Sequence, residues 1–290
     1  METEEKSLNT KRPWFDLLRS RLGYQFPRLG PLFFKLFYSA VRKHCSVELF
    51  PGILIETNFD DLTHQATYWQ GKRFEYPTAQ VLCEWAADPR CHAFFDVGAN
   101  YGFFSYLILS HFPAQVHAFD PNPVNHSQLT TAKATNGLSN LHPHRLGLSD
   151  EDGVRQLHLG DRDQGHSTFL SHPGLAKTAV SESSIVRFDD WVDQQTELTP
   201  LPDTPCWIAK IDVEGYELKV LRGMENSLKK RRFLGLAVEL NEYTLGLSGT
   251  SPKEIHDLMA HCGYKNYKET LAGRRLPLHR APNDFFVPST

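Results

Sequence analysis

Short apolar runs alternate with segments of helical periodicity from residue 93 onward, and this alternation constrains the fold more than any other feature of the chain. Because parallel strands must be joined by a long crossover, usually a helix, such alternation is typical of a parallel sheet with helices on its faces. We therefore predict an α/β fold with strands at 93–97, 115–119, 141–148, 207–213 and 234–240, and shorter ones at 264–269 and 284–287. The predicted helices between them are 103–112, 124–136, 216–230 and 252–262.

The 290 residues suffice for one such domain with an extension. Residues 1–45 are predicted to be a basic, aromatic-rich helical extension. Residues 46–290 are predicted to be the α/β domain, which begins with two short strands around the turn Pro51-Gly52. Within it, residues 150–190 contain short strand-like pieces separated by Gly, Asp, His and Ser, so we interpret them as an inserted, loop-rich segment.

Charge is concentrated at the start of the chain. Residues 1–43 hold nine Lys or Arg and four acidic residues, whereas the whole chain has a formal charge of −3, which excludes a globally basic surface and hence a nucleic-acid partner. The apolar stretch 29–41 is too short to span a bilayer and contains Lys35. Two interpretations stay open for 1–43: peripheral contact with an anionic membrane or a partner, and a helix packed on the main domain.

The five cysteines include no C-x-x-C pair and their number is odd. This disfavours a disulfide scaffold and a zinc ribbon and favours a reducing compartment. We therefore expect a cytoplasmic protein, with peripheral membrane contact as the alternative. The sequence indicates no particular oligomeric state.

The strongest motif lies where the first buried strand meets a helix, the place where open α/β sheets bind nucleotide-like ligands. It contains Asp96, Gly98, Asn100 and Gly102, and its glycines allow a tight turn and close approach of a ligand. Asp120 follows at the tip of the next strand, 22 residues after Gly98, where a carboxylate can accept hydrogen bonds from a ribose diol.

The motif distinguishes two classes of cofactor. A dinucleotide fold reads G-x-G-x-x-G, but here Asn100 replaces the second glycine and Phe103 follows Gly102. A carboxylate at position 96, at the edge of the pocket, would repel a pyrophosphate and attract a sulfonium and an ammonium group. The pattern therefore favours S-adenosylmethionine over a dinucleotide and argues against an oxidoreductase.

Together, the stretches 96–102, 119–122, 210–217 and 238–239 resemble the FkbM family of methyltransferases over about residues 46–270. The block Lys210-Ile-Asp-Val-Glu-Gly-Tyr-Glu217 is the most specific of these motifs. The resemblance implies a Rossmann-like, mostly parallel sheet of seven strands, S-adenosylmethionine as cofactor and, in most members, O-methylation. Residues 1–43 lie outside it.

Three carboxylates are candidates for the catalytic end of the site. Asp212 and Glu214 follow the fourth predicted strand and Glu239 ends the fifth, so all three are expected at the ligand-binding edge of the sheet. A hydroxyl acceptor is a weak nucleophile whose proton must be taken, and Asp212 is the first candidate for that base, with Glu214 second. Alternatively, the carboxylates orient sugar hydroxyls or bind a divalent cation, or Glu214 forms a structural salt bridge with Lys210. We predict no metal site.

Further candidates are weaker. Asn122 is placed near the adenine or ribose, and Asp150 near the adenine amino group, although both also suit ordinary turns. His166 and Ser167, in the inserted segment, are candidates for contact with the substrate.

We therefore expect an S-adenosylmethionine-dependent enzyme that methylates a hydroxyl of a sugar, a polyketide or another small metabolite. The alternatives are a nitrogen- or protein-directed methyltransferase on the same fold and a non-catalytic protein that retains the cofactor fold.

Overall fold

The computed structural model describes residues 44–71, 74–160, 164–171, 179–195, 198, 206–267 and 283–289. The chain divides into two compact units, Met1–Tyr76 and Pro77–Thr290, which we describe separately. Residues 1–43 of the predicted helical extension 1–45 lie outside the described residues, and residues 44 and 45 begin a strand rather than end a helix.

The first unit contains a hairpin and a helix. Strands β1 (His44–Phe50) and β2 (Ile53–Asn58) pair antiparallel around the predicted Pro-Gly turn. Helix α3 (Leu62–Gln70) begins at Asp61, whose side chain accepts a hydrogen bond from the His64 amide. The aromatic rings of Phe59 and Tyr68 pack edge to face, with centroids 4.9 Å apart. The predicted hairpin at 46–56 is thus confirmed.

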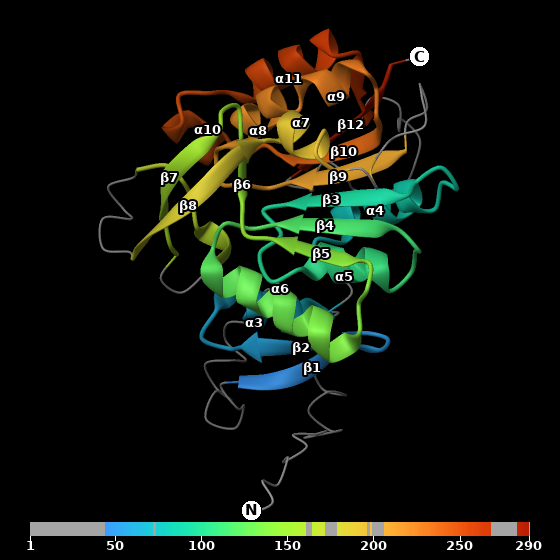
Figure 1. Cartoon of the computed structure of the whole chain (residues 1–290), viewed down its shortest axis with the longest axis vertical. Helices are drawn as coiled ribbons and strands as arrows, with labels where there is room; N and C mark the ends of the chain where they lie inside the picture. Colours follow the sequence, from blue (N-terminus) through green and yellow to red (C-terminus); the bar gives the residue numbers. More distant parts are fainter. Residues whose placement is uncertain are drawn as a thin grey trace, which may run out of the picture. The chain divides into compact units, whose positions relative to one another are not determined.

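The second unit is built on a seven-stranded sheet, with the strand order β11-β12-β10-β9-β3-β4-β5 (Figure 1). Its strands are β3 (Ala93–Val97), β4 (Gln115–Phe119), β5 (Leu141–His144), β9 (Trp207–Ile211), β10 (Phe233–Glu239), β11 (Tyr264–Asn266) and β12 (Asn283–Pro288). The strands from β10 to β5 pair in parallel, and β12 runs antiparallel to both of its neighbours. The predicted Rossmann-like, mostly parallel sheet of seven strands is confirmed.

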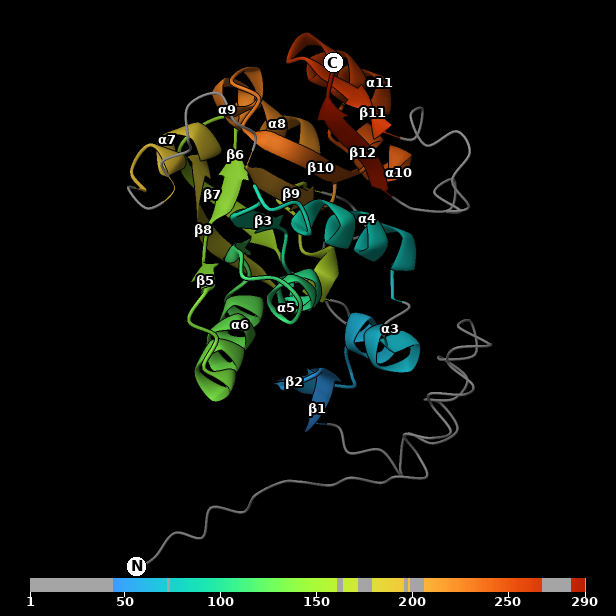
Figure 2. The ribbon, with the colours of Figure 1, turned by 90° about the vertical axis from the view of Figure 1, so that its right-hand side faces the viewer.

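Helices cover both faces of this sheet. They are α4 (Tyr76–Ala86), α5 (Phe103–Leu109), α6 (Pro123–Asn136), α7 (Phe188–Val192), α8 (Glu217–Gly223), α9 (Glu225–Lys229), α10 (Glu242–Leu247) and α11 (Pro252–His261). In Figure 2, α4 and α5 lie on one face, and α8, α9 and α11 on the other. On the second face, buried aromatic rings of Phe95, Phe188, Trp207 and Phe233 contact one another. None of the helices that the structure describes is long and apolar enough to cross a membrane.

The predicted strand 141–148 is wrong in one respect, because the chain leaves the large sheet after His144. Its second half, β6 (Gly147–Ser149), forms a three-stranded sheet with β7 (Gly153–His158) and β8 (Val180–Arg187), in the order β6-β8-β7. The inserted segment is therefore a small sheet that begins before residue 150.

The predicted helix 216–230 is divided at Met224 into α8 and α9. A Cβ atom on Gly223 would lie 1.9 Å from the Ser149 carbonyl oxygen, so α8 packs in backbone contact with β6. Helix α10 was not predicted. It begins with Asn241 as N-cap, two residues after the end of β10.

Candidate active site

A cavity with about 520 Å³ of open space lies at the carboxyl ends of β3, β4 and β9. The turn at Gly98 and Asn100, Asp120 and the segment 146–148 contribute to its lining, together with Gly165, Ser167, Thr168, Phe169, Asp212, Val213 and Tyr216. The candidates His166, Glu214 and Glu239 are not among the lining residues. This is the edge where open α/β sheets bind ligands.

The turn after β3 packs directly on the turn after β9. Gly98 has a φ of +78°, and an added Cβ would lie 1.8 Å from the carbonyl oxygen of Asp212. Asn100 is also left-handed, with a φ of +51°, and both residues line the cavity. Gly102 does not line it: a Cβ there would lie 2.6 Å from the Leu129 side chain, so this glycine serves the packing of α5 on α6.

Asp120 is a buried carboxylate on the cavity wall. It accepts hydrogen bonds from the amide nitrogens of Asn100 and Asn122, at 2.7 and 2.9 Å, and from Asn125 Nδ2 at 3.2 Å. Burial raises the pKa of Asp120 to about 7, although these three hydrogen bonds oppose the shift. A carboxylate offers about four acceptor positions, so one is left for a ligand hydroxyl.

Asn122 and Asp150 do not line the cavity. Asn122 is buried and caps α6, because its Oδ1 accepts from the Val124 amide at 2.9 Å. Its Nδ2 donates to Ser167 Oγ at 3.1 Å, and Ser167 does line the cavity. Asp150 accepts from Ser149 Oγ and lies 3.7 Å from Lys219 Nζ.

Asp96 lies beneath the turn and does not line the cavity. Its Oδ2 accepts from both Ser105 N (3.0 Å) and Ser105 Oγ (2.6 Å) at the start of α5. Burial raises its pKa, with the charge of Lys210 and the Ser105 hydrogen bonds opposing. The prediction that this carboxylate stands at the pocket edge is therefore corrected: Asp120 and Asp212 are the carboxylates that face the cavity.

Lys210 is a buried cation between the two turns. On β9 it is the register partner of Asp96 on β3. Its Nζ lies 2.6 Å from Asp212 Oδ2 and 4.8 Å from the centre of the Phe104 ring. The salt bridge suggested for Lys210 and Glu214 is thus made with Asp212 instead.

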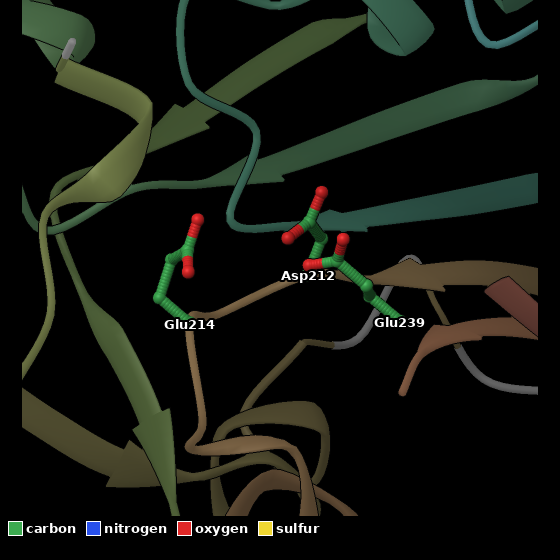
Figure 3. A group of neighbouring side chains, drawn as sticks. All are labelled: Asp212, Glu214 and Glu239. Carbon is green, nitrogen blue, oxygen red and sulfur yellow. The ribbon is translucent and has the colours of Figure 1, made fainter. Parts of the chain in front are cut away.

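The structure brings Asp212, Glu214 and Glu239 together, with one oxygen of each within 4.8 Å of the others (Figure 3). Glu239 donates a hydrogen bond to Asp212, and burial, followed by the charge of Asp212, raises the pKa of Glu239 to about 10. Burial opposes ionisation of Asp212, but the Lys210 ammonium and the hydrogen bonds from Glu239 and Lys210 outweigh it and lower its pKa. Asp212 is therefore ionised and Glu239 is a neutral acid at pH 7.

This is the one group of three potential metal ligands found among the described residues. The ammonium of Lys210 and the proton of Glu239 offset the negative charge of two of its members.

Glu214 has an unusual backbone for its residue type, with a φ of +52°. Its carbonyl oxygen accepts from Thr168 Oγ1 at 3.0 Å. Its carboxylate Oε1 lies 3.7 Å from Nε2 of His166, which belongs to the short 3₁₀ helix Gln164–His166.

Glu217 is a site residue that sequence reasoning missed. Its side chain is buried, and Oε1 accepts from the amides of Val213 and Gly215, at 3.0 and 3.2 Å, so it holds the turn that carries Glu214. Burial raises its pKa to about 7. In the sequence, a glutamate in the first turn of a helix looks like ordinary complementarity to the helix dipole, so no local signal marks it.

Comparison with known proteins agrees with this geometry. The sequence profile of the methyltransferase FkbM domain matches residues 96–265, more than half of the chain. The chain belongs to the FkbM methyltransferase family. The resemblance predicted from the sequence motifs is confirmed, and with it S-adenosylmethionine as the methyl donor.

Two curated relatives are similar over part of their length. Hexuronic acid methyltransferase AglP of Haloferax volcanii is 28% identical over 188 residues, which cover 65% of this chain and 69% of AglP. Methyltransferase sdnD of Sordaria araneosa is 31% identical over 153 residues, or 45% of this chain and 59% of sdnD. Among solved structures, a SAM-dependent methyltransferase from Aquifex aeolicus aligns with a TM-score of 0.39 and 14% identity, covering 74% of this chain and 90% of that one.

Proposed function

We propose that this chain transfers a methyl group from S-adenosylmethionine to a hydroxyl group of a sugar or another small metabolite. The observation that carries the proposal is the cluster of Asp212, Glu214 and Glu239 at the edge of the cavity that Asp120 and the Gly98 turn line. Similarity to AglP, a hexuronic acid methyltransferase, supports a sugar as acceptor.

The lining residues suit each part of the donor. Asp120 keeps one acceptor position for a ribose hydroxyl. The apolar side chains of Phe119, Leu148 and Phe169 suit a flat base. The ionised Asp212 supplies negative charge to a ligand with a sulfonium and an ammonium group. Asp96 and Asn122 lie below the cavity surface, where Asp96 hydrogen-bonds Ser105 and Asn122 hydrogen-bonds Ser167.

The carboxylate cluster suits a hydroxyl acceptor. When bound, the donor supplies an already activated methyl group, so the protein must mainly align the acceptor oxygen and accommodate its proton. Asp212 can accept a hydrogen bond from the acceptor hydroxyl, and the neutral Glu239 can donate one to a neighbouring oxygen. A pair of one acceptor and one donor matches adjacent hydroxyls of a sugar.

Titration calorimetry with S-adenosylhomocysteine tests the donor site. We expect Asp120→Ala to weaken binding about 10- to 100-fold, since a hydrogen bond to a charged group contributes about 1.5–3 kcal/mol. Asp257→Ala, which removes an exposed carboxylate of α11, is the control and should bind like the unmodified chain. Equal affinities of Asp120→Ala and the control would contradict the ribose assignment.

The acceptor is tested with isotopically labelled S-adenosylmethionine and a panel of uronic acids, neutral methyl glycosides, hydroxylated polyketides and lysine peptides. We expect label in an ether or ester oxygen–methyl bond, identified by mass spectrometry of the product. Transfer only to nitrogen of the peptides would reject the proposed O-methylation, and tight binding of the donor without transfer to any compound would favour a non-catalytic role.

A further inference from the structure

We propose that Asn125 is a positioning residue for the methyl donor, because it directs a single hydroxyl of the donor ribose to one oxygen of Asp120. The inference rests on the proposed function, in which Asp120 binds the ribose. It depends on which oxygen of Asp120 each hydrogen-bond donor contacts, and on the buried amide of Asn125.

The two carboxylate oxygens of Asp120 are not equally occupied. Oδ2 accepts from the Asn100 amide at 2.7 Å and from Nδ2 of Asn125 at 3.2 Å. Oδ1 accepts from the Asn122 amide at 2.9 Å. Each carboxylate oxygen offers about two acceptor positions, so the described residues saturate Oδ2. The position that remains for a ligand hydroxyl therefore belongs to Oδ1.

Of these three donors, Asn125 is the one whose contact depends on its side chain. The other two are backbone amides, which any residue except proline would supply at positions 100 and 122. Without the Asn125 amide, Oδ2 would offer a second acceptor position and a ribose hydroxyl could bind either oxygen. Asn125 thus determines which oxygen of Asp120 the ligand meets.

An amide at position 125 contributes little to the stability of the fold. Asn125 lies in the first turn of α6, is 1% exposed and shares the buried face of this helix with Leu129 and Ala132. Its Oδ1 is buried and accepts no hydrogen bond within the described part of the chain. The cost of a buried acceptor without a donor offsets the gain from the bond of Nδ2 to Asp120. The amide therefore serves the orientation of Asp120 rather than folding.

Asn125 also favours the ionised state of Asp120, which is the better acceptor for a hydroxyl. Burial raises the pKa of Asp120 to about 7, and the bond from Asn125 is among the contacts that oppose this shift. The charge of Asp96 on β3 raises this pKa further, and Asp212, after β9, lines the same cavity. On β5, burial keeps the ring of His144 neutral near pH 7.

Titration calorimetry with S-adenosylhomocysteine and its 2′-deoxy and 3′-deoxy analogues tests the single contact. We expect Asn125→Ala to weaken binding of S-adenosylhomocysteine about three- to tenfold, the usual effect of one hydrogen bond. One of the two analogues should bind the variant and the unmodified chain equally, because it lacks the hydroxyl that Asp120 binds. The other analogue should lose affinity as S-adenosylhomocysteine does.

Three results of this titration would overturn the proposal. One is no loss of affinity in Asn125→Ala for any of the three ligands, and another is an equal loss for all three. The third is a loss that disappears in both analogues, since both hydroxyls would then depend on Asp120.

Gln128→Ala is the matched control, because Gln128 lies one turn further along α6 and its Oε1 is also buried without a donor among the described residues. Its amide is not among the three groups that donate to Asp120. This variant should bind all three ligands like the unmodified chain. An equal loss in Gln128→Ala and Asn125→Ala would trace the effect to general loosening of α6 and contradict the positioning role.

Asn125→Asp keeps the shape of the side chain and replaces its donor by a carboxylate, so it tests the same contact without a cavity. At pH 8.5 it should show the same dependence on the ribose hydroxyl and at least the same loss of affinity. Binding of S-adenosylhomocysteine by Asn125→Asp as tight as by the unmodified chain would refute the contact.

The pH profile of binding separates positioning from a structural role. In the unmodified chain the affinity for S-adenosylhomocysteine should fall as the pH decreases through about 7, because Asp120 becomes protonated. In Asn125→Ala the fall should be centred at a higher pH, since a hydrogen bond to the ionised form is lost. A profile parallel to that of the unmodified chain would overturn the proposal.

The Asp120→Ala variant distinguishes failure of this inference from failure of the proposed function. Undiminished binding of S-adenosylhomocysteine by Asp120→Ala would count against the ribose assignment itself. Weak binding by Asp120→Ala together with undiminished binding by Asn125→Ala would count against the role of Asn125 alone.

Discussion

The two turns that meet at the cavity share a backbone conformation but differ in the residues that adopt it. After β3, Gly98 and Asn100 have φ values of +78° and +51°, and after β9, Glu214 and Gly215 have values of +52° and +96°. Asparagine enters the left-handed region easily, because its short amide can bond to the local backbone, whereas glutamate has no such advantage.

The contacts that hold the two turns also differ. The turn after β3 is held by Asp120, which itself lines the cavity and accepts from the Asn100 amide. The turn after β9 is held by Glu217, which is 1% exposed and does not line the cavity. Asp120 both lines the cavity and supports its turn, whereas Glu217 only supports its turn. The strained Glu214 is thus held by a carboxylate that does not itself line the cavity.

The largest expected effect comes from the charge that both turns share. Lys210 faces Asp96 across the strand pair and contacts Asp212, and it is 3% exposed. Lys210→Met leaves the buried Asp96 and the partly buried Asp212 without their cation, so we expect it to lower the free energy of unfolding by about 3–5 kcal/mol. Urea denaturation measures this loss.

Lys219→Met is the matched control for this experiment, because the Lys219 side chain is 38% exposed and its ammonium lies 3.7 Å from Asp150. We expect it to change stability by less than about 1 kcal/mol. Similar losses in the two variants would mean that Lys210 does not couple the turns.

A smaller effect is expected where the two turns touch. Gly98→Ala places a Cβ 1.8 Å from the Asp212 carbonyl oxygen and also strains a left-handed φ. We expect it to cost about 2–4 kcal/mol. Gly137 is a control in the same unit, since its φ of +62° is similar but no atom lies within 4 Å of the added Cβ. Urea denaturation should show a markedly smaller loss for Gly137→Ala; equal losses would refute the contact.

Local sequence patterns predicted two of the central strands of the sheet with their bounds. Strands β3 and β4 were predicted with the bounds that the structure has, since each is a short buried apolar run that ends at a polar or glycine residue. The prediction of a single strand over 141–148 was wrong, because alternation of apolar residues shows that a segment is extended but not which sheet it joins.

For the site, the motifs predicted which residues gather at the sheet edge but not which way their side chains point. Asp212, Glu214 and Glu239 do meet there. Asp96 instead points to Ser105 beneath the turn, a contact across nine residues that no spacing rule distinguishes from exposure to the cavity. Glu217 was missed for the same reason: its function depends on burial, which only the packed structure reveals.

The dependence of stability on pH tests the buried Glu217, which holds the turn after β9. Burial raises the pKa of Glu217 from 4.5 to about 7, so the folded chain holds a proton in this window that the unfolded chain releases. Its contribution to stability is therefore lost as the pH rises through that range, by about 2–3 kcal/mol between pH 5 and 8. Glu217→Gln should flatten the pH dependence by this amount, measured by urea denaturation at each pH.

The difference between variant and unmodified chain is the informative quantity here, because other buried groups titrate as well. Asp120 and Glu239 act in the same direction as Glu217. His117 and His144 act in the opposite direction, since burial lowers their pKa values to about 3 and 4. Glu254→Gln, at an exposed position of α11, should leave the pH dependence of stability unchanged. If Glu217→Gln also left it unchanged, Glu217 would not be the group that titrates.

The smallest expected change in stability comes from replacing the left-handed residue of each turn, Glu214 or Asn100, by glycine. Glycine has no Cβ to disfavour a left-handed φ, so Glu214→Gly relieves strain of about 1–2 kcal/mol and loses part of it to the greater freedom of glycine in the unfolded chain. We expect a net gain of up to about 1 kcal/mol in the free energy of unfolding together with loss of methyl transfer. Asn100→Gly should change the free energy of unfolding by only a few tenths of about 1 kcal/mol, because asparagine is hardly strained in a left-handed conformation. Thermal and urea denaturation of the two variants would measure the difference, and a gain in Asn100→Gly equal to that in Glu214→Gly would mean that the strain does not mark the functional residue. A more stable but inactive Glu214→Gly variant is what a chain would show if it keeps a strained glutamate for its chemistry rather than for its fold.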